Sequence, residues 1–285
     1  MSEITLDHKS MVNAPVGVFD SGLGGLTVAR EIMRLLPAED IVYFGDTARV
    51  PYGSKSKDTI LYFSRQIVRF LKTKNVKAIV VACNTASALA LPTLREEIDI
   101  PIIGVVEPGA HAAAKATKTG HVGVIGTQAT VSSGIYAKVI GEIDETISVI
   151  GKACPLFVPM VEEGLADHPM MMQMIDYYLS SIKESNVDAL VLGCTHYPLL
   201  RGRIHEYLGD AITLVNPAYE TAMGLKGLLG KHGLLRPEKS ADETQKNQAA
   251  ANLYVSDLPE RFKEFANSIL PVDIERVKTV NIEQF

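Results

Sequence analysis

Two nine-residue segments of the chain are near copies of each other, and each brings a cysteine to the end of a predicted buried strand. Residues 75–83 read NVKAIVVAC, and residues 186–194 read NVDALVLGC. The asparagine, two valines, one alanine and the cysteine match position for position. Because two of the three cysteines in the chain hold equivalent places, the sequence predicts an internal duplication that contributes one thiol from each half, Cys83 and Cys194. Such symmetry suits chemistry on two faces of one atom.

The pattern of apolar residues predicts an α/β fold. Apolar runs of four to eight residues alternate with longer segments of helical period, which is typical of βα units and a parallel sheet. Helices are expected at 25–36 and from 57 or 58 to 72, because apolar residues recur there every three to four positions. The expected strands are 16–19, 41–44, 78–82, 102–105, 122–125, 190–192 and 213–215.

A second pair of similar segments extends the duplication. Residues 16–21 read VGVFDS and residues 122–127 read VGVIGT. Breaks that contain proline or glycine, at 107–109 and 216–217, separate the halves. A chain of 285 residues is long enough for two domains of ordinary size. We therefore expect two pseudo-symmetric α/β domains with mostly parallel sheets and a short extension: residues 12–107 plus 217–285, residues 108–216, and the N-terminal extension 1–11.

The C-terminal part of the chain is expected to complete the first domain. A polar segment at 237–248 precedes an expected strand, helix and strand between residues 252 and 282. In parallel sheets, ligands bind beyond the carboxyl ends of the strands. If the two domains face each other through those ends, the two cysteines meet across an interdomain cleft. Three polar side chains at other strand ends would join them there: Asp20, Asp46 and Thr127.

Charge and composition narrow the function classes. The formal net charge is −5 with a pI near 5.8, and no run of Lys or Arg forms a basic stripe, so nucleic acid is not an expected partner. Apolar runs stay far below the roughly 20 residues that span a bilayer. Residues 1–15 lack the basic start and apolar stretch of a secretory signal. Three cysteines make no disulfide framework, and unpaired thiols persist in reducing compartments, so we expect a cytoplasmic protein.

The sequence around the two repeated cysteines favours a functional role for both. Small polar residues follow each of them, NTAS after Cys83 and THYP after Cys194, and a helix N-terminus lowers the pKa of a thiol. A zinc site that uses Cys194 and His196 is less favoured, because zinc needs three or four ligands and usually wider spacing. A redox disulfide is also less favoured, because no C-x-x-C motif is present. The third cysteine, Cys154, has no polar cluster around it and is expected to pack in the core.

A glycine-rich segment follows the first expected strand. Residues 20–25 read DSGLGG, and glycines between a strand and a helix let backbone N–H groups approach an anion. The segment lacks the G-x-G-x-x-G pattern, so dinucleotide binding is less favoured than a carboxylate held by Ser21 and the backbone. A tight turn without a ligand is the other interpretation. Two further loops, 45–53 and 155–164, hold comparable places in the two halves and belong either to the site or to the surface.

Four motifs together resemble those of the glutamate racemases in the aspartate/glutamate racemase superfamily. They are GVFDSGLGGL at 17–26, the loop 45–53, VACNTA at 81–86 and GCTHYP at 193–198, and the likeness extends from about residue 16 to 216. The resemblance implies an isomerase that interconverts L- and D-glutamate without a cofactor or metal and supplies D-glutamate for peptidoglycan. It therefore implies a part in cell-wall biogenesis and cell shape, and a homodimer.

The resemblance also assigns roles to residues. It places the two catalytic cysteines on Cys83 and Cys194, with Cys83 acting on D-glutamate and Cys194 on L-glutamate. Supporting groups fall on Asp20, Glu162, His196 and Asp46. The implied substrate contacts are Asp20, Ser21, Pro51, Tyr52, Gly53, Asn84, Thr85, Thr127, Thr195 and His196.

The chemistry agrees with these roles. Inverting an amino acid removes the α-hydrogen from one face and returns a hydrogen to the other, so it needs two acid/base groups on opposite sides. A thiolate and a thiol meet that need, provided that neighbours hold their protons. Fixed donors in a dry cleft must stabilise the developing carbanion. Two alternatives remain open: a racemase of aspartate or another small amino acid, and a protein that binds an amino acid without turning it over.

Overall fold

The computed structural model describes residues 8–237 and 250–285. Most of the predicted N-terminal extension and of the polar segment at 237–248 lies outside the described residues. Within the described part, no helix combines the length and apolar character that a membrane span requires.

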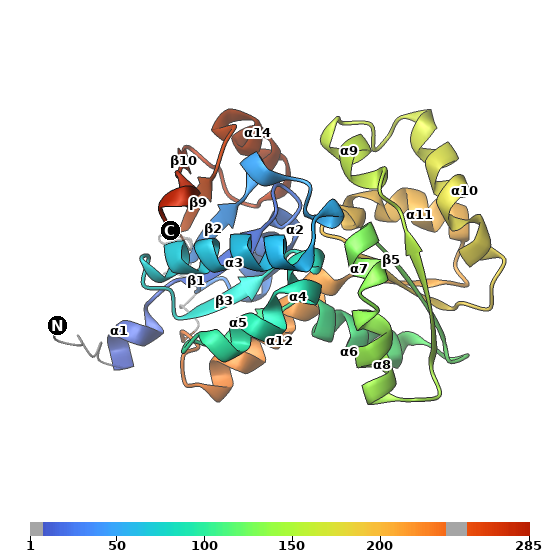
Figure 1. The fold of residues 1–285 in the computed structure, drawn as a ribbon, viewed down its shortest axis with the longest axis horizontal. Helices are drawn as coiled ribbons and strands as arrows, with labels where there is room; N and C mark the ends of the chain where they lie inside the picture. Colours follow the sequence, from blue (N-terminus) through green and yellow to red (C-terminus); the bar gives the residue numbers. More distant parts are fainter. Residues whose placement is uncertain (1–7, 238–249) are drawn as a thin grey trace.

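Two parallel sheets organise the chain (Figure 1). The first sheet has six strands in the order β10-β9-β2-β1-β3-β4, and the second has four in the order β6-β5-β7-β8. The first contains β1 (Val16–Asp20), β2 (Ile41–Gly45), β3 (Ala78–Val81), β4 (Ile102–Gly104), β9 (Ala251–Val255) and β10 (Val277–Thr279). The second contains β5 (His121–Gly126), β6 (Ser148–Ala153), β7 (Ala189–Gly193) and β8 (Thr213–Val215).

Helices cover both faces of each sheet. On the first sheet, α2 (Leu26–Leu35), α12 (Pro217–Lys231) and α14 (Pro259–Ile269) share one core, and α3 (Lys57–Lys72), α4 (Asn84–Leu89) and α5 (Leu91–Glu97) share the other. On the second sheet, α6 (Val106–Ala116) and α8 (Ile135–Ile143) lie on one face. The other face packs on α9 (Phe157–Glu162), α10 (Pro169–Lys183) and α11 (Arg201–Leu208). The remaining α-helices among residues 8–237 and 250–285 are α1 (His8–Val12) and α7 (Gln128–Ser132).

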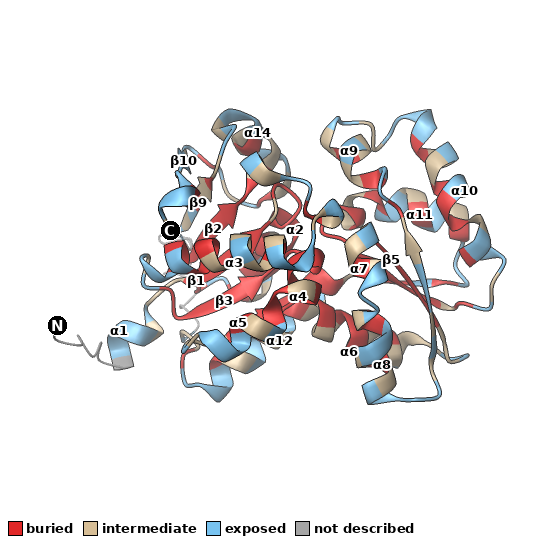
Figure 2. Ribbon diagram, in the orientation of Figure 1, coloured by how far each residue is buried: buried red, intermediate tan, exposed pale blue. Residues whose placement is uncertain are grey.

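Burial on both faces explains the continuous apolar runs of the strands. Figure 2 shows the central strands buried between helices whose outer sides are exposed. In β1, Val16 and Val18 pack on one face of the sheet and Phe19 on the other. A strand enclosed in this way carries apolar residues at successive positions instead of alternating with polar ones.

The α/β fold class and all seven expected strands are confirmed, as are the two expected helices, which correspond to α2 and α3. The strand, helix and strand expected near the C-terminus are β9, α14 and β10, and they join the first sheet beside β2. The edge strand β6 was not predicted, because several of its residues are exposed. The exact domain boundaries stay a prediction.

The repeated segments occupy equivalent places in the two sheets. In the first sheet β1 pairs with β2 and β3, and in the second β5 pairs with β6 and β7. The registers also correspond, with Val16 opposite Ala78 and Val122 opposite Ala189. The duplication therefore places each cysteine just beyond the carboxyl end of a central strand, where parallel sheets bind their ligands.

A buried ion pair fixes the opposite end of the first sheet. The Lys77 side chain is fully buried just before β3, and its Nζ lies 2.5 Å from Glu39 Oε2. Nζ also donates hydrogen bonds to the carbonyl oxygens of Val12 and Leu234. Burial lowers the pKa of Lys77, and the hydrogen bond to Glu39 opposes that shift. The pair thus connects the N-terminal segment, the start of β2 and the end of α12.

Removing the cation of this pair is expected to destabilise the fold strongly. Lys77→Met leaves the buried Glu39 carboxylate with only the more distant Arg236 guanidinium, whose Nε is 3.9 Å away, so the free energy of unfolding should fall by about 3 kcal/mol. Lys72→Met is the matched control, because the Lys72–Asp99 pair is exposed and such pairs contribute below about 1 kcal/mol. Urea unfolding of both variants measures the difference. Equal changes in the two variants would contradict this account of Lys77.

Candidate active site

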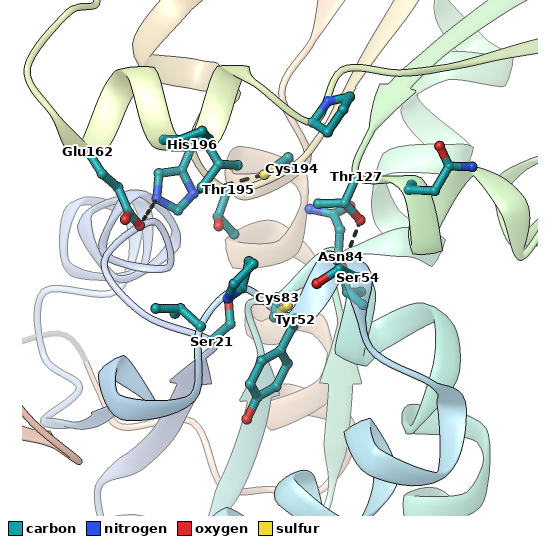
Figure 3. Close-up of a pocket in the computed structure, with 18 residues that line it drawn as sticks. Ser21, Tyr52, Ser54, Cys83, Asn84, Thr127, Glu162, Cys194, Thr195 and His196 are labelled. Atoms are coloured by element: carbon teal, nitrogen blue, oxygen red, sulfur yellow. Dashed lines mark hydrogen bonds and ion pairs between the residues drawn. The ribbon is translucent and has the colours of Figure 1, made fainter.

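One cavity of about 280 Å³ lies at the carboxyl ends of both sheets and contains both repeated cysteines (Figure 3). Figure 3 shows Cys194 with Thr195 and His196 on one side, and Cys83 with Ser21 on the other. Of the predicted site residues, the cavity is lined by Ser21, Pro51, Tyr52, Gly53, Cys83, Asn84, Thr85, Thr127, Glu162, Cys194, Thr195 and His196. The structure therefore brings together residues that the sequence spreads over 175 positions, from Ser21 to His196.

Cys83 is a buried thiol at the beginning of α4. It caps this helix, and its Sγ accepts a long hydrogen bond of 3.5 Å from the backbone N–H of Ala86. Burial raises the pKa of Cys83 to about 12, and the charge of Asp20 adds to the rise. The Ala86 N–H and the Ser21 hydroxyl oppose the shift but do not overcome it. The expectation that the pKa of this thiol lies below its usual value is therefore wrong, because burial outweighs the donors at the helix terminus.

Cys194 belongs to a chain of three ionisable side chains. Its Sγ lies 3.9 Å from His196 Nδ1, and His196 Nε2 lies 3.0 Å from Glu162 Oε1 at the end of α9. Burial alone would lower the pKa of His196, but the hydrogen bonds to Cys194 and Glu162 raise it to about 10. At neutral pH His196 is therefore an imidazolium that donates to the sulfur on one side and to the carboxylate on the other.

Asp20 lies behind the cavity wall and acts on both cysteine environments. It is fully buried at the end of β1, where its carboxylate accepts hydrogen bonds from Gly22 N–H and Thr195 Oγ1. Burial raises the pKa of Asp20, and the positive charge of His196 opposes the rise. Its charge in turn raises the pKa of Cys83. Asp20 is thus coupled to a thiol on its own side and to the histidine of the other half.

Neutral donors line the space between the cysteines. Thr85 Oγ1 and Thr127 Oγ1 lie 3.0 Å apart, one from each half. The Tyr136 hydroxyl donates to Asn84 Oδ1 at 2.7 Å, which leaves the Asn84 amide NH₂ as a donor. Among the described residues that line the cavity, none is Lys or Arg. An anionic ligand here would depend on hydroxyl, amide and backbone donors and on His196.

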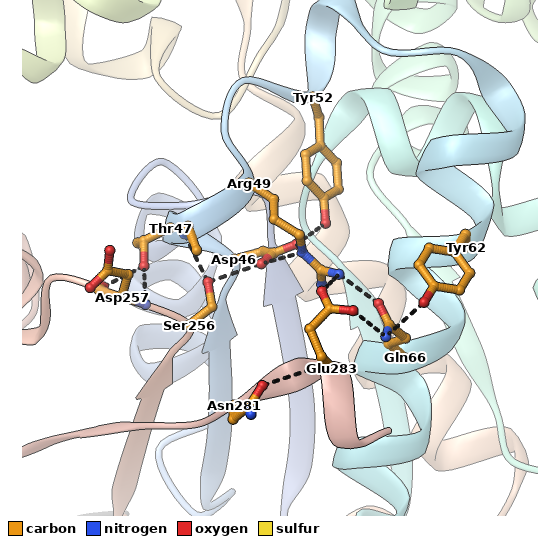
Figure 4. Close-up of polar contacts among 11 residues, drawn as sticks. Asp46, Thr47, Arg49, Tyr52, Tyr62, Gln66, Ser256, Asp257, Asn281 and Glu283 are labelled. Atoms are coloured by element: carbon orange, nitrogen blue, oxygen red, sulfur yellow. Dashed lines mark hydrogen bonds and ion pairs between the residues drawn. The ribbon is translucent and has the colours of Figure 1, made fainter.

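Asp46 occupies a different position from the other predicted acids. It does not line the cavity, and its side chain is fully buried below the loop at 47–54. Its carboxylate accepts hydrogen bonds from Arg49 Nε at 2.8 Å, from Ser256 Oγ at 2.9 Å and from the Tyr52 hydroxyl (Figure 4). The structure therefore gives Asp46 contact with Tyr52, which lines the cavity, and no place on the cavity surface itself.

Some lining residues were not identified from the sequence. The sequence left the segment at 155–164 open between the site and the surface. In the structure this segment, which includes α9, contributes to the cavity wall. Ser54 and Gln128 directly follow the predicted contacts Gly53 and Thr127. Their position next to these residues is the one feature of the sequence that could have identified them. The lining residues that the sequence analysis missed are Val50, Ser54, Gln128, Pro155, Val158 and Pro159.

The fold and the site together define a class of protein. Two buried thiols from equivalent strands of two parallel sheets line one small cavity. Each has an ionisable neighbour, Asp20 for Cys83 and His196 for Cys194, that can exchange a proton with the sulfur or offset its charge. This is the arrangement of a two-base acid/base enzyme that acts on a small anionic molecule.

Comparisons with known proteins give the family. A family model described as Asp/Glu/Hydantoin racemase matches residues 16–222. A glutamate racemase of Geobacter metallireducens is 47% identical over 268 residues, which cover 94% of this chain and 97% of that protein. The chain belongs to the Asp/Glu/hydantoin racemase family.

Solved structures agree with this assignment. A glutamate racemase of Bacillus anthracis superposes with a TM-score of 0.87 at 40% identity, covering 94% of this chain and 97% of that one. A glutamate racemase of Francisella tularensis in complex with D-glutamate also gives a TM-score of 0.87, at 37% identity, covering 96% and 100%. Both likenesses extend over nearly the whole chain.

The raised pKa of His196 predicts a pH-dependent stability. An imidazolium favoured by the fold contributes stability that is fully present below about pH 6.5 and is lost as the pH rises through about 10. His196→Gln should remove this contribution, so its free energy of unfolding should fall less than that of the wild type between these pH values. Urea unfolding at pH values across this range measures the free energy of unfolding of the variant and of the wild type.

His205→Gln is the matched control, because His205 is half-exposed and faces the exposed Asp210. This variant should keep the pH dependence of the wild type. A pH dependence of His196→Gln that equals the wild-type dependence would contradict the proposed protonation of His196.

Proposed function

We propose that the protein interconverts L- and D-glutamate, with Cys83 and Cys194 as the two acid/base groups. The observation that carries the proposal is the presence of both repeated cysteines, unbridged, in one small cavity at the ends of equivalent strands. Relatives over nearly the full chain length are glutamate racemases, and one of them was solved with D-glutamate. The reaction that this site suits is therefore removal of the α-hydrogen of glutamate from one face of the α-carbon and return of a hydrogen to the opposite face, without a cofactor.

The two cysteines divide the work because their neighbours differ. One sulfur, as thiolate, takes the α-proton, and the thiol on the opposite side gives its proton to the same carbon. The imidazolium of His196 supplies the positive charge that a thiolate at Cys194 requires, whereas burial keeps Cys83 protonated. Removal of the α-proton by Cys194 is the direction that the family resemblance associates with L-glutamate.

The reverse direction needs a base for the Cys83 proton. Asp20 is the candidate, because its carboxylate is buried, interacts with Cys83 and has a raised pKa. A carboxylate with a raised pKa accepts a proton more readily than an ordinary one. After Cys83 has removed the α-proton of D-glutamate, the thiol of Cys194 returns a proton to the other face.

Neutral donors hold the substrate in this proposal. Glutamate brings two carboxylates into a cavity without Lys or Arg among its described lining residues. Preorganised hydroxyl, amide and backbone donors stabilise negative charge well in a site that excludes water. The donors proposed for this role are Ser21, Asn84, Thr85, Thr127 and Thr195, together with the backbone of the Pro51–Tyr52–Gly53 segment.

A supply of D-glutamate for peptidoglycan, and hence a role in the cell wall and cell shape, is the physiological part of the proposal. A cytoplasmic location is supported by three free cysteines, which persist in reducing compartments. The homodimer implied by the family resemblance stays a prediction.

Solvent deuterium is the direct test of the activity. Enzyme incubated with D-glutamate in heavy water, without added cofactor, should yield L-glutamate that carries deuterium at the α-carbon. Cys83→Ala and Cys194→Ala should each lower the rate by about 10²–10⁴-fold, because each removes one acid/base group. Chiral chromatography with mass spectrometry measures both products and label.

Cys154→Ala is the matched control, because Cys154 is also buried and unbridged but does not line the cavity. It should keep the wild-type rate. An unchanged sample would indicate a protein that only binds the amino acid, and faster turnover of aspartate would favour a different racemase. Full activity in either of the other two alanine variants would contradict the two-thiol assignment.

A close approach between the halves gives a second prediction. A Cβ atom at Gly24 would lie 2.4 Å from Thr195 Oγ1 and 2.5 Å from His196 Nδ1. Gly24→Ala should therefore displace the residues beside Cys194 and lower kcat/KM for glutamate by roughly 100-fold, as small misplacements of catalytic groups do. Gly141→Ala is the control, because a Cβ there meets nothing within 4 Å, and it should be fully active. Wild-type kcat/KM in Gly24→Ala would show that this approach is unimportant.

A further inference from the structure

One wall of the cavity is a loop with little regular structure of its own. Residues 50–54 line the cavity, and the loop contains only two short 3-10 turns, η1 (Thr47–Arg49) and η2 (Tyr52–Ser54). Such a segment lacks the internal hydrogen bonds that fix a long helix or strand. Its position must therefore depend on contacts with other parts of the chain.

Arg49 makes several of these contacts (Figure 4). Its side chain is only 11% exposed, and its Nε donates to both carboxylate oxygens of Asp46, at 2.8 and 3.0 Å. Its Nη1 donates to Gln66 Oε1 on α3 and to Glu283 Oε1, 3.2 Å away near the C-terminus. The guanidinium also lies 4.0 Å from the centre of the Phe63 ring.

The C-terminal part of the chain also contacts the beginning of the loop. The Ser256 hydroxyl, just after β9, accepts a hydrogen bond from Ala48 N–H at 2.8 Å and donates one to Asp46. Thr47 and Asp257 exchange two hydrogen bonds, Thr47 Oγ1 to the Asp257 carbonyl and Asp257 N–H to Thr47 Oγ1. Residues more than 200 positions away in sequence thus contact all three residues of η1, Thr47, Ala48 and Arg49.

Tyr52 connects the cluster of Asp46, Arg49 and Ser256 to the cavity. Its hydroxyl donates to Asp46, while the residue itself lines the cavity beside Gly53. Asp46 has no exposed surface and therefore acts on the substrate wall only through Tyr52 and Arg49. A change at Arg49 would remove one of the three side chains that donate to Asp46, and would leave Ser256 and Tyr52.

We infer that Arg49 is a positioning residue: together with Asp46 it locks the substrate-facing loop at 50–54 to the C-terminal residues Ser256 and Glu283. The inference rests on the proposed function, in which this wall receives glutamate. It assigns to Glu283, which is outside the cavity and 60% exposed, an effect on substrate binding. Neither Arg49 nor Glu283 contacts the cysteines, so the effect should be on binding more than on proton transfer.

Conservative variants test the inference by kinetics. Arg49→Lys keeps the charge but loses the planar guanidinium, whose Nε contacts Asp46 while its Nη1 contacts Gln66 and Glu283. Its KM for D-glutamate should rise roughly tenfold with kcat within about threefold of wild type, the signature of lost ground-state binding. Glu283→Gln removes one charge from the exposed end of the cluster and should raise KM by roughly twofold. This second variant carries the test should Arg49→Lys fold poorly.

The chain offers a matched control pair between α3 and α5. Arg65 and Glu97 form an exposed ion pair that does not contact the loop. Arg65→Lys and Glu97→Gln make the same two chemical changes there and should leave both kinetic constants unchanged. A KM unchanged in both test variants, or a fall in kcat at unchanged KM, would overturn the inference.

Hydrogen–deuterium exchange gives a readout that does not depend on turnover. Peptides covering residues 47–54 should exchange faster in Arg49→Lys and Glu283→Gln than in the wild type and in the controls. Exchange at the wild-type rate in both variants would overturn the inference even with normal racemisation. Faster exchange in the two variants, combined with a wild-type protein that does not racemise glutamate, would instead support the loop lock and refute the proposed function.

Discussion

The placement of two buried thiols around one small space is the constraint on which the rest of the structure depends. Each thiol follows a central strand, and the two strands hold equivalent places in their sheets. Burial suits the chemistry because it excludes water, but it also disfavours the thiolate that must form. The neighbours of each sulfur therefore decide whether the site can work.

The two sides meet this difficulty in different ways. On the Cys194 side, His196 is held as a cation between a sulfur and the Glu162 carboxylate, so a negative sulfur has a positive partner. On the Cys83 side, the neighbour is Asp20, whose negative charge raises the pKa of the thiol but which can also receive its proton. A pseudo-symmetric fold thus carries an asymmetric pair of acid/base groups. The two substrates of the proposed reaction, L- and D-glutamate, are enantiomers, and each is assigned to one of these two groups.

Much of this could be predicted from the sequence, because the decisive signals are local. Strands buried on both faces leave continuous apolar runs, and the repeated run ending in cysteine identified both thiols and their shared site. The edge strand β6 was missed because it is partly exposed and contains Gly151 and Lys152 in place of a continuous apolar run. The prediction for the Cys83 pKa was wrong because a helix terminus is a local signal, whereas burial depends on the whole fold.

The environment of Asp46 could not be predicted for a similar reason. Its position after a strand suggested a place beside the substrate, but its partners Ser256 and Arg49 bind it below the cavity wall. One of these partners lies 210 residues away, and no pattern in the sequence connects them. Contacts of this kind determine whether an acidic side chain acts on the substrate or supports the loop that does.

A crystal structure of the wild-type protein with bound glutamate would test the central claim most directly. The account predicts that the α-carbon lies between the two sulfurs, with Cys83 Sγ and Cys194 Sγ each within about 3–3.5 Å of it on opposite faces. Glutamate bound with its α-carbon near only one sulfur, or bound outside the cavity, would contradict it.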